Sequence, residues 1–248
     1  MGLMGVMSAQ AQFGDYGVRF GLGGATIQDD LSTKSPVLGV NAGAYLNYTF
    51  KHSPTALAEI FYLQTGLNVI RRGNTFEEFY EHGNTLAYRT GYHHSWYVQL
   101  PVLAGVHVEM PIREPGHVVG FFLGPAVSYG VTGRYADRLI TPGYSSRSVN
   151  YDVNFGGTAA DRKLFNHINR LDISAIFGVS YEHGDFTFSL FVDHGFLAVS
   201  EGEDVLQTII NNMSGTTNTN TNTNTNIPDG NNNAVMLSVA YKLGSFLK

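Results

Sequence analysis

The sequence predicts an all-β fold class, an eight-stranded antiparallel up-and-down transmembrane β-barrel. The first observation is a hairpin at 171–197, where two strands of about a dozen residues meet at the tight turn His183-Gly184-Asp185. Soluble strands usually have about five or six residues, whereas a tilted membrane-spanning strand needs about 9–11. The second observation is that apolar residues alternate with small or polar ones along both strands, which is typical of a transmembrane barrel. The third is that the connections alternate in length along the chain.

Eight such segments occur in the chain. They are expected at 16–27, 37–50, 57–71, 94–109, 118–132, 171–182, 186–197 and 234–246. The second segment alternates most regularly, with Leu38, Val40 and Leu46 on the expected lipid side and Asn41 and Asn47 on the other.

The third segment alternates less regularly than the others. Its outward set is expected to be Ala58, Ile60, Tyr62 and Ile70, and its inward set includes Glu59 and Thr65. Leu63 and Leu67 interrupt this pattern, which leaves a bulge or a shifted register open.

The connections after the odd-numbered segments are longer than those after the even-numbered ones. Three of them are long and are expected to be extracellular loops: 72–93, 133–170 and 199–233. Short periplasmic turns opposite long extracellular loops are the pattern of outer-membrane barrels. An even number of strands then places both termini in the periplasm.

Composition excludes several classes of protein. Charged residues make up 14% of the chain, against roughly 25% in average soluble domains, yet no run of about 18 apolar residues forms a transmembrane helix. A net charge of −5 gives no footprint for nucleic acid, and the lack of cysteine excludes thiol chemistry. Residues 1–11 resemble the end of a signal peptide, possibly truncated, which leaves 12–248 as the barrel domain.

Polar side chains are expected inside the barrel and aromatic ones at its two membrane interfaces. The expected interior cluster is Arg19, Glu59, Gln99, His107, Glu109, Glu182 and Lys242. An eight-stranded barrel is just filled by side chains, so these charges are expected to pair into a structural plug, with a proton or small-solute path as the alternative. The expected interfacial aromatics are Tyr48, Phe50, Tyr62, Trp96, Tyr129, Tyr181 and Phe186.

No residue pattern predicts catalysis, a cofactor or a metal. His93 and His94 are adjacent on a strand and point to opposite faces, so they cannot easily chelate one ion. Asp172, Asp193, His167 and His194 could form an acid–base pair for a surface hydrolase, but no known catalytic motif accompanies them. The protein is therefore expected not to be an enzyme.

Two prolines lie inside expected strands, where proline removes a hydrogen-bond donor. If the turn between the fourth and fifth strands closes near its middle, Pro101 and Pro125 lie almost opposite one another. They are then expected to share a single defect at one depth.

Four stretches in fixed order carry a family resemblance: AEIFYLQTG at 58–66, WYVQLPVLAGV at 96–106, GFFLGPAVSYG at 120–130 and FGVSYEHGDFTFSL at 177–190. They resemble the outer-membrane β-barrel family of Bacteroidota often labelled PorT-like, although Ala58 and Ser128 depart from its pattern. The resemblance implies an eight-stranded barrel with periplasmic termini and implies no activity. Its founding member is associated with the type IX secretion system.

The expected function is that of a non-enzymatic outer-membrane barrel whose long loops serve surface interaction or envelope integrity. The alternatives are an accessory subunit of a secretion or envelope machine and, third, an outer-membrane enzyme. The expected partners are the lipid bilayer, the barrel-assembly machinery during insertion and an envelope or secretion protein.

Overall fold

The computed structural model describes residues 11–28, 34–51, 60–82, 85–110, 117–140, 146–155, 167–168, 170–198 and 231–246. The barrel strands are β1 (Ala11–Gln28), β2 (Lys34–Lys51), β3 (Ile60–His82), β4 (Thr85–Glu109), β5 (His117–Ile140), β9 (Leu171–His183), β10 (Phe186–Ala198) and β11 (Asn231–Phe246). Three shorter strands are β6 (Arg147–Asp152), β7 (Asn154–Phe155) and β8 (His167–Ile168).

The eight long strands form a closed ring of antiparallel neighbours. Consecutive strands pair from β1 to β5, β5 pairs with β9, and β11 closes the ring by pairing with β1. The expected fold class is confirmed.

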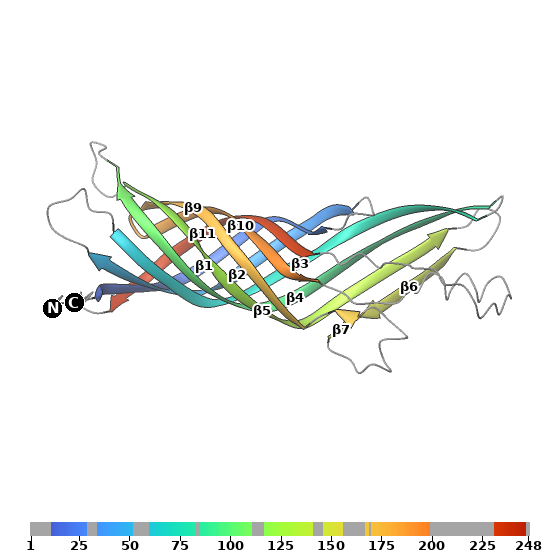
Figure 1. Ribbon diagram of the computed structural model, residues 1–248, viewed down its shortest axis with the longest axis horizontal. Coiled ribbons are helices and arrows are strands. Elements are labelled where there is room, and N and C mark those ends of the chain that lie inside the picture. The colour runs from blue at the N-terminus through green and yellow to red at the C-terminus, as the bar shows by residue number, and fades with distance from the viewer. Residues whose placement is uncertain are drawn as a thin grey trace, which may run out of the picture.

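The strands are staggered around the ring. A path through directly paired residues runs Gly14, Tyr48, Leu63, Ala104, Leu123, Phe177, Val192, Val235 and Gly24. It therefore returns to β1 at a later residue than the one it left, which requires the strands to tilt against the barrel axis. Figure 1 shows this tilt, with the start of β1 and the end of β11 at the same end. We call this the termini end.

Alternation along the strands gives the barrel an apolar outer belt and a filled interior. Phe20, Leu100, Leu123 and Leu237 are between 51% and 67% exposed, and every barrel strand contributes such residues. Between them lie buried inward residues such as Asn41, Gln99 and Ser238. The tight turn of the β9–β10 hairpin is the two residues Gly184 and Asp185, and Gly184 supplies the positive φ of +61° that such a turn needs.

The register of β3 differs from the expectation. Phe61, Leu63, Leu67 and Val69 are the exposed side chains, whereas Tyr62 (4% exposed) and Ile70 (0%) point inward. A shift of one residue exchanges the two faces of a strand. The interior of β3 accepts Tyr62 because its partner across the sheet is Gly105, where a Cβ atom would lie 2.4 Å from Tyr62 Cζ.

Two of the expected loops are largely β-structure. In place of a loop at 72–93, β3 and β4 continue as a paired hairpin from Arg72↔Ser95 to His82↔Thr85. The expected loop 133–170 begins with β5, which continues to Ile140 and pairs with β6. Of 199–233, residues 231–233 belong to β11 and the rest lies outside the described residues.

The outer parts of β3, β4, β5 and β6 form a sheet that runs beyond the barrel at the end opposite the termini (Figure 1). We call this the sheet extension. One face of its inner part is buried, with Arg72, Asn74, Phe76 and His93 at most 8% exposed. These buried residues are mostly polar, so hydrophobic alternation does not mark the strands.

The prediction for the two prolines is confirmed. Pro101 pairs with Ala126, the neighbour of Pro125, and no paired residues occur between Pro101 and Ala104 on that side of β4. The carbonyl of Pro101 accepts a hydrogen bond from Thr65 Oγ1 at 2.9 Å on its other side.

Candidate functional site

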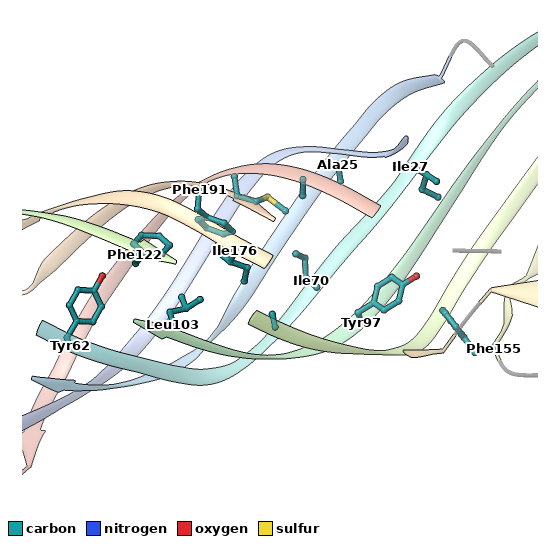
Figure 2. Close-up of a cluster of buried hydrophobic side chains, with 13 residues drawn as sticks. Ala25, Ile27, Tyr62, Ile70, Tyr97, Leu103, Phe122, Phe155, Ile176 and Phe191 are labelled. Carbon is teal, nitrogen blue, oxygen red and sulfur yellow. The ribbon is translucent and has the colours of Figure 1, made fainter. Parts of the chain in front are cut away.

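The middle of the barrel interior is filled by apolar side chains. Five consecutive strands of the ring, β4, β5, β9, β10 and β11, each contribute one side chain that is at most 6% exposed. These are Leu103, Phe122, Ile176, Phe191 and Met236. Figure 2 shows these rings and branches converging on the barrel axis. The Phe122 and Phe191 ring centroids lie 6.4 Å apart. This layer fills the interior on the side of β4 to β11, and the buried polar residues Asn41 and Asn68 face it from β2 and β3.

A buried charge cluster lies next to this layer on the side away from the termini. Arg72 (1% exposed) donates hydrogen bonds from its two Nη atoms to Asp172 Oδ2 and Asp193 Oδ2. Both aspartates are at most 3% exposed. The three side chains come from β3, β9 and β10 and therefore tie distant parts of the ring together. We call them the charge plug.

Neutral donors add hydrogen bonds to one oxygen of each aspartate in the charge plug, while Arg72 Nε, Asp172 Oδ1 and Asp193 Oδ1 are buried without a partner. Gln99 Nε2 donates to Asp193 Oδ2 at 2.9 Å and to Ser128 Oγ at 3.3 Å. Asn232 Nδ2 donates to Asp172 Oδ2 at 3.1 Å. The Arg72 guanidinium lies 5.6 Å from the Tyr97 ring centroid, so the ring covers the cation from the outer side. A buried ion pair survives only with such further hydrogen bonds.

The termini end of the interior contains a small polar cavity of about 70 Å³. His107 Nε2 lies 3.1 Å from Glu182 Oε1, and Lys242 Nζ lies 2.8 Å from Asp15 Oδ1. Arg19 Nη2 donates to Gln64 Oε1 at 2.5 Å. Phe122 of the apolar layer also lines this cavity, which we call the vestibule.

Five members of the expected interior cluster lie in these two polar regions. Gln99 belongs to the surroundings of the charge plug, and Arg19, His107, Glu182 and Lys242 line the vestibule. Glu59 lies outside the described residues. Glu109 is exposed, contrary to the expectation, because it is the last residue of β4 and water reaches the end of the strand.

The expected interfacial aromatics lie at both ends of the belt, with two exceptions. Trp96 and Tyr129 lie toward the sheet extension, and Tyr48, Tyr181 and Phe186 lie toward the termini end. Tyr62 was wrongly assigned to the interface: it is buried in the interior and its ring stacks on His107 with centroids 4.1 Å apart. The side chain of Phe50 lies outside the described residues.

The side chains considered for catalysis or metal binding are not assembled into a site. Asp193 is buried in the charge plug, whereas His194 points to the opposite face, with Nδ1 2.5 Å from Asn233 Oδ1. His93 lies inside and its Nε2 is 2.8 Å from Ser95 Oγ, whereas His94 lies outside. The side chain of His167 is not described. In the part of the chain that the structure describes, no group of three metal-ligating side chains occurs.

Arg72 is the interior residue that the sequence analysis missed. The expected strand ended at Arg71, which placed Arg72 in a loop. The inward positions Asn68, Ile70, Arg72 and Asn74 continue the period of two, and all four are buried. Following this alternation past the last apolar outward residue would have found it.

A closed antiparallel barrel with an apolar outer belt and a filled polar and apolar interior defines the class of a transmembrane β-barrel protein. The comparison with protein families agrees: residues 9–200 match the model of the outer membrane protein beta-barrel domain. The chain belongs to this family, and it is an outer-membrane β-barrel protein. Among its described residues, no helix is long and apolar enough to cross a membrane.

Solved structures add little to this assignment. Ail, the attachment invasion locus protein of Yersinia pestis, matches with 10% identity and a TM-score of 0.32, covering 96% of this chain and 100% of Ail. Ail in complex with the heparin analogue sucrose octasulfate matches with 11% identity and a TM-score of 0.30, covering 94% and 99%. Such low values carry no argument about function. No curated protein matches the chain.

Proposed function

We propose that the protein is a non-enzymatic outer-membrane barrel that presents the sheet extension outside the cell, where the extension contacts a partner. The observation that carries this proposal is the sheet extension itself. Strands β3, β4 and β5 run far past the belt, and β6 widens the sheet at its edge. A barrel that served only as a plug in the membrane would not need them.

The exposed surface of the sheet extension supports a role in recognition. Phe79 is 78% exposed and its ring centroid lies 4.9 Å from that of Tyr88. Large exposed aromatic side chains are enriched where proteins bind partners. Because the interior is closed, this surface is a better candidate for function than a transport path.

The proposal includes an orientation, with both termini in the periplasm after removal of a signal peptide. It is tested with single cysteines, because the chain contains none. On intact cells, a membrane-impermeant maleimide should label Phe79→Cys, whereas Asp185→Cys at the termini end should react only after the outer membrane is permeabilised. The reverse result would contradict the orientation.

The contact itself is tested by photo-cross-linking on intact cells. A photoreactive phenylalanine analogue at position 79 should form adducts with macromolecules, and the same analogue at the lipid-facing position 186 should not. Adducts at 186 alone, or none at 79, would contradict the proposal.

The second candidate is an accessory subunit of a secretion or envelope machine, the role suggested by the PorT-like resemblance. The observation that favours it is the polar termini end, where the His117 and His183 rings stack 4.6 Å apart beside the exposed Asp185. In that case the photoreactive group should form protein adducts at position 185 rather than at 79.

A further inference from the structure

Three basic side chains come together on the outer wall of the barrel, just beyond the apolar belt. Arg71 (β3), His94 (β4) and Arg134 (β5) lie on neighbouring strands, because Gly73 pairs with His94 and His94 pairs with Arg134. They share the outward face with exposed Val69 and Tyr92, while the alternate residues Arg72 and His93 are buried inside. We call Arg71, His94 and Arg134 the basic rim.

Asp152 of β6 is the cross-strand partner of Arg134, whereas Arg71 and His94 have no carboxylate among their direct partners on the described strands. No ion pair there joins Arg71 or Arg134 to a carboxylate, and the two buried atoms Arg71 Nε and His94 Nδ1 have no hydrogen-bond partner. Burial, together with the positive charges of Arg71 and Arg134, lowers the pKa of His94, which lies outside the belt. The positive potential here therefore comes from the two arginines, and His94, with its lowered pKa, adds little charge at neutral pH.

The basic rim lies at the depth of the membrane interface. Arg71 pairs directly with Trp96, whose strand enters the exposed apolar belt at Leu100. Tryptophan favours the headgroup level of a bilayer, so the adjoining guanidinium groups are at the level of lipid phosphates.

The opposite wall lacks this charge. The outward positions beyond the belt on β1, β2 and β11 include Thr26, Pro36 and Asn233, and none of the described side chains at these positions is arginine or lysine. Among the described side chains, the outward arginines of the basic rim thus have no counterpart on β1, β2 and β11.

We propose that the basic rim binds the phosphate group of an anionic lipid headgroup in the leaflet next to the sheet extension. Arginine presents a planar set of donors that matches phosphate oxygens, and Arg71 on β3 and Arg134 on β5 flank β4, so they can hold one phosphate from two sides. The Trp96 ring lies beneath, beside the first part of the acyl chains. This lipid site goes beyond the proposed role of the sheet extension and does not depend on it.

The test uses Trp96 as its own reporter, because it is the single tryptophan of the chain. The full chain is reconstituted in phosphatidylcholine vesicles to which a lipid with brominated acyl chains is added. This lipid is either phosphatidic acid or phosphatidylcholine, and its bromine atoms quench tryptophan emission on contact. Brominated phosphatidic acid should quench Trp96 emission at a several-fold lower fraction of the vesicle lipid than brominated phosphatidylcholine requires. Arg71→Gln and Arg134→Gln should each reduce this preference about fivefold.

Arg138→Gln is the matched control. Arg138 is an exposed arginine of the same strand, about 13 Å further from the belt than Arg134, so its loss should leave the preference unchanged. Two measurements check that every variant is folded and inserted. One is quenching by brominated phosphatidylcholine, and the other is a difference in SDS-gel migration between boiled and unboiled samples. Equal quenching by the two lipids in the parent protein, or an equal loss in Arg138→Gln, would overturn the proposal.

Discussion

Arg72 holds together three strands that are distant in sequence. Its guanidinium is the single cation between Asp172 and Asp193, so the charge plug contains two carboxylates for one positive charge. Removal of one partner from a buried ion pair leaves an uncompensated charge, which is far more costly than removal of an exposed pair. Removal of the cation and removal of one anion therefore have different consequences. Without Arg72 both acids are unpaired, whereas without Asp172 the remaining ion pair is neutral.

Arg72→Met should therefore lower the free energy of unfolding by about 3–5 kcal/mol. Asp172→Asn keeps an oxygen that accepts from Arg72 and should cost about 1 kcal/mol. Urea unfolding in lipid vesicles, followed by Trp96 emission, measures both values. Equal losses in the two variants would mean that packing rather than charge balance dominates at this site.

At the scale of single elements, β3 is the strand whose two faces are hardest to tell apart. Large apolar residues occur at both odd and even positions of the strand: Phe61 and Leu63 are exposed, and Tyr62 and Ile70 are buried. The interior of a small barrel accepts apolar side chains, so hydrophobicity alone does not orient such a strand. Pairing with Gly105 decides the matter for Tyr62, because glycine leaves space for the ring.

The register of β3 can be tested with environment-sensitive fluorophores on single cysteines. A label on Leu63→Cys should emit at short wavelength and be quenched by brominated lipid, because Leu63 is 43% exposed on the belt. A label on Gln64→Cys, which faces the vestibule, should escape this quenching. The opposite pattern would restore the register in which Tyr62 faces lipid.

For the whole molecule, the layered interior has a consequence for transport. The apolar layer around Leu103 and Phe191 lies between the charge plug and the vestibule, and eight strands leave an interior just wide enough for side chains. The barrel should therefore be electrically silent when inserted singly into a planar bilayer. Regular conductance steps from the folded protein, absent from a lipid-only control, would contradict the closed interior.

The sequence alone determined the ring of strands and most of their faces. Long alternating segments identify membrane strands because lipid and interior impose opposite polarity on successive residues. The same logic, applied to the turn between β4 and β5, correctly placed Pro101 beside Pro125. It failed for the outer parts of β3 and β4, where the buried positions include the polar residues Arg72, Asn74 and His93, so hydrophobicity does not distinguish the two faces.

Only the tertiary structure decided which side chains of distant strands meet. The sequence marked Asp172 and Asp193 as notable acids and Gln99 as an interior residue, but nothing local shows that Arg72 binds both acids and that Gln99 donates to Asp193. Likewise, Arg71, His94 and Arg134 are unrelated in sequence and become one basic surface only through the register of β3, β4 and β5. Alternation is a local property that a single strand carries, whereas the depth at which side chains of different strands meet is set by stagger around the closed ring.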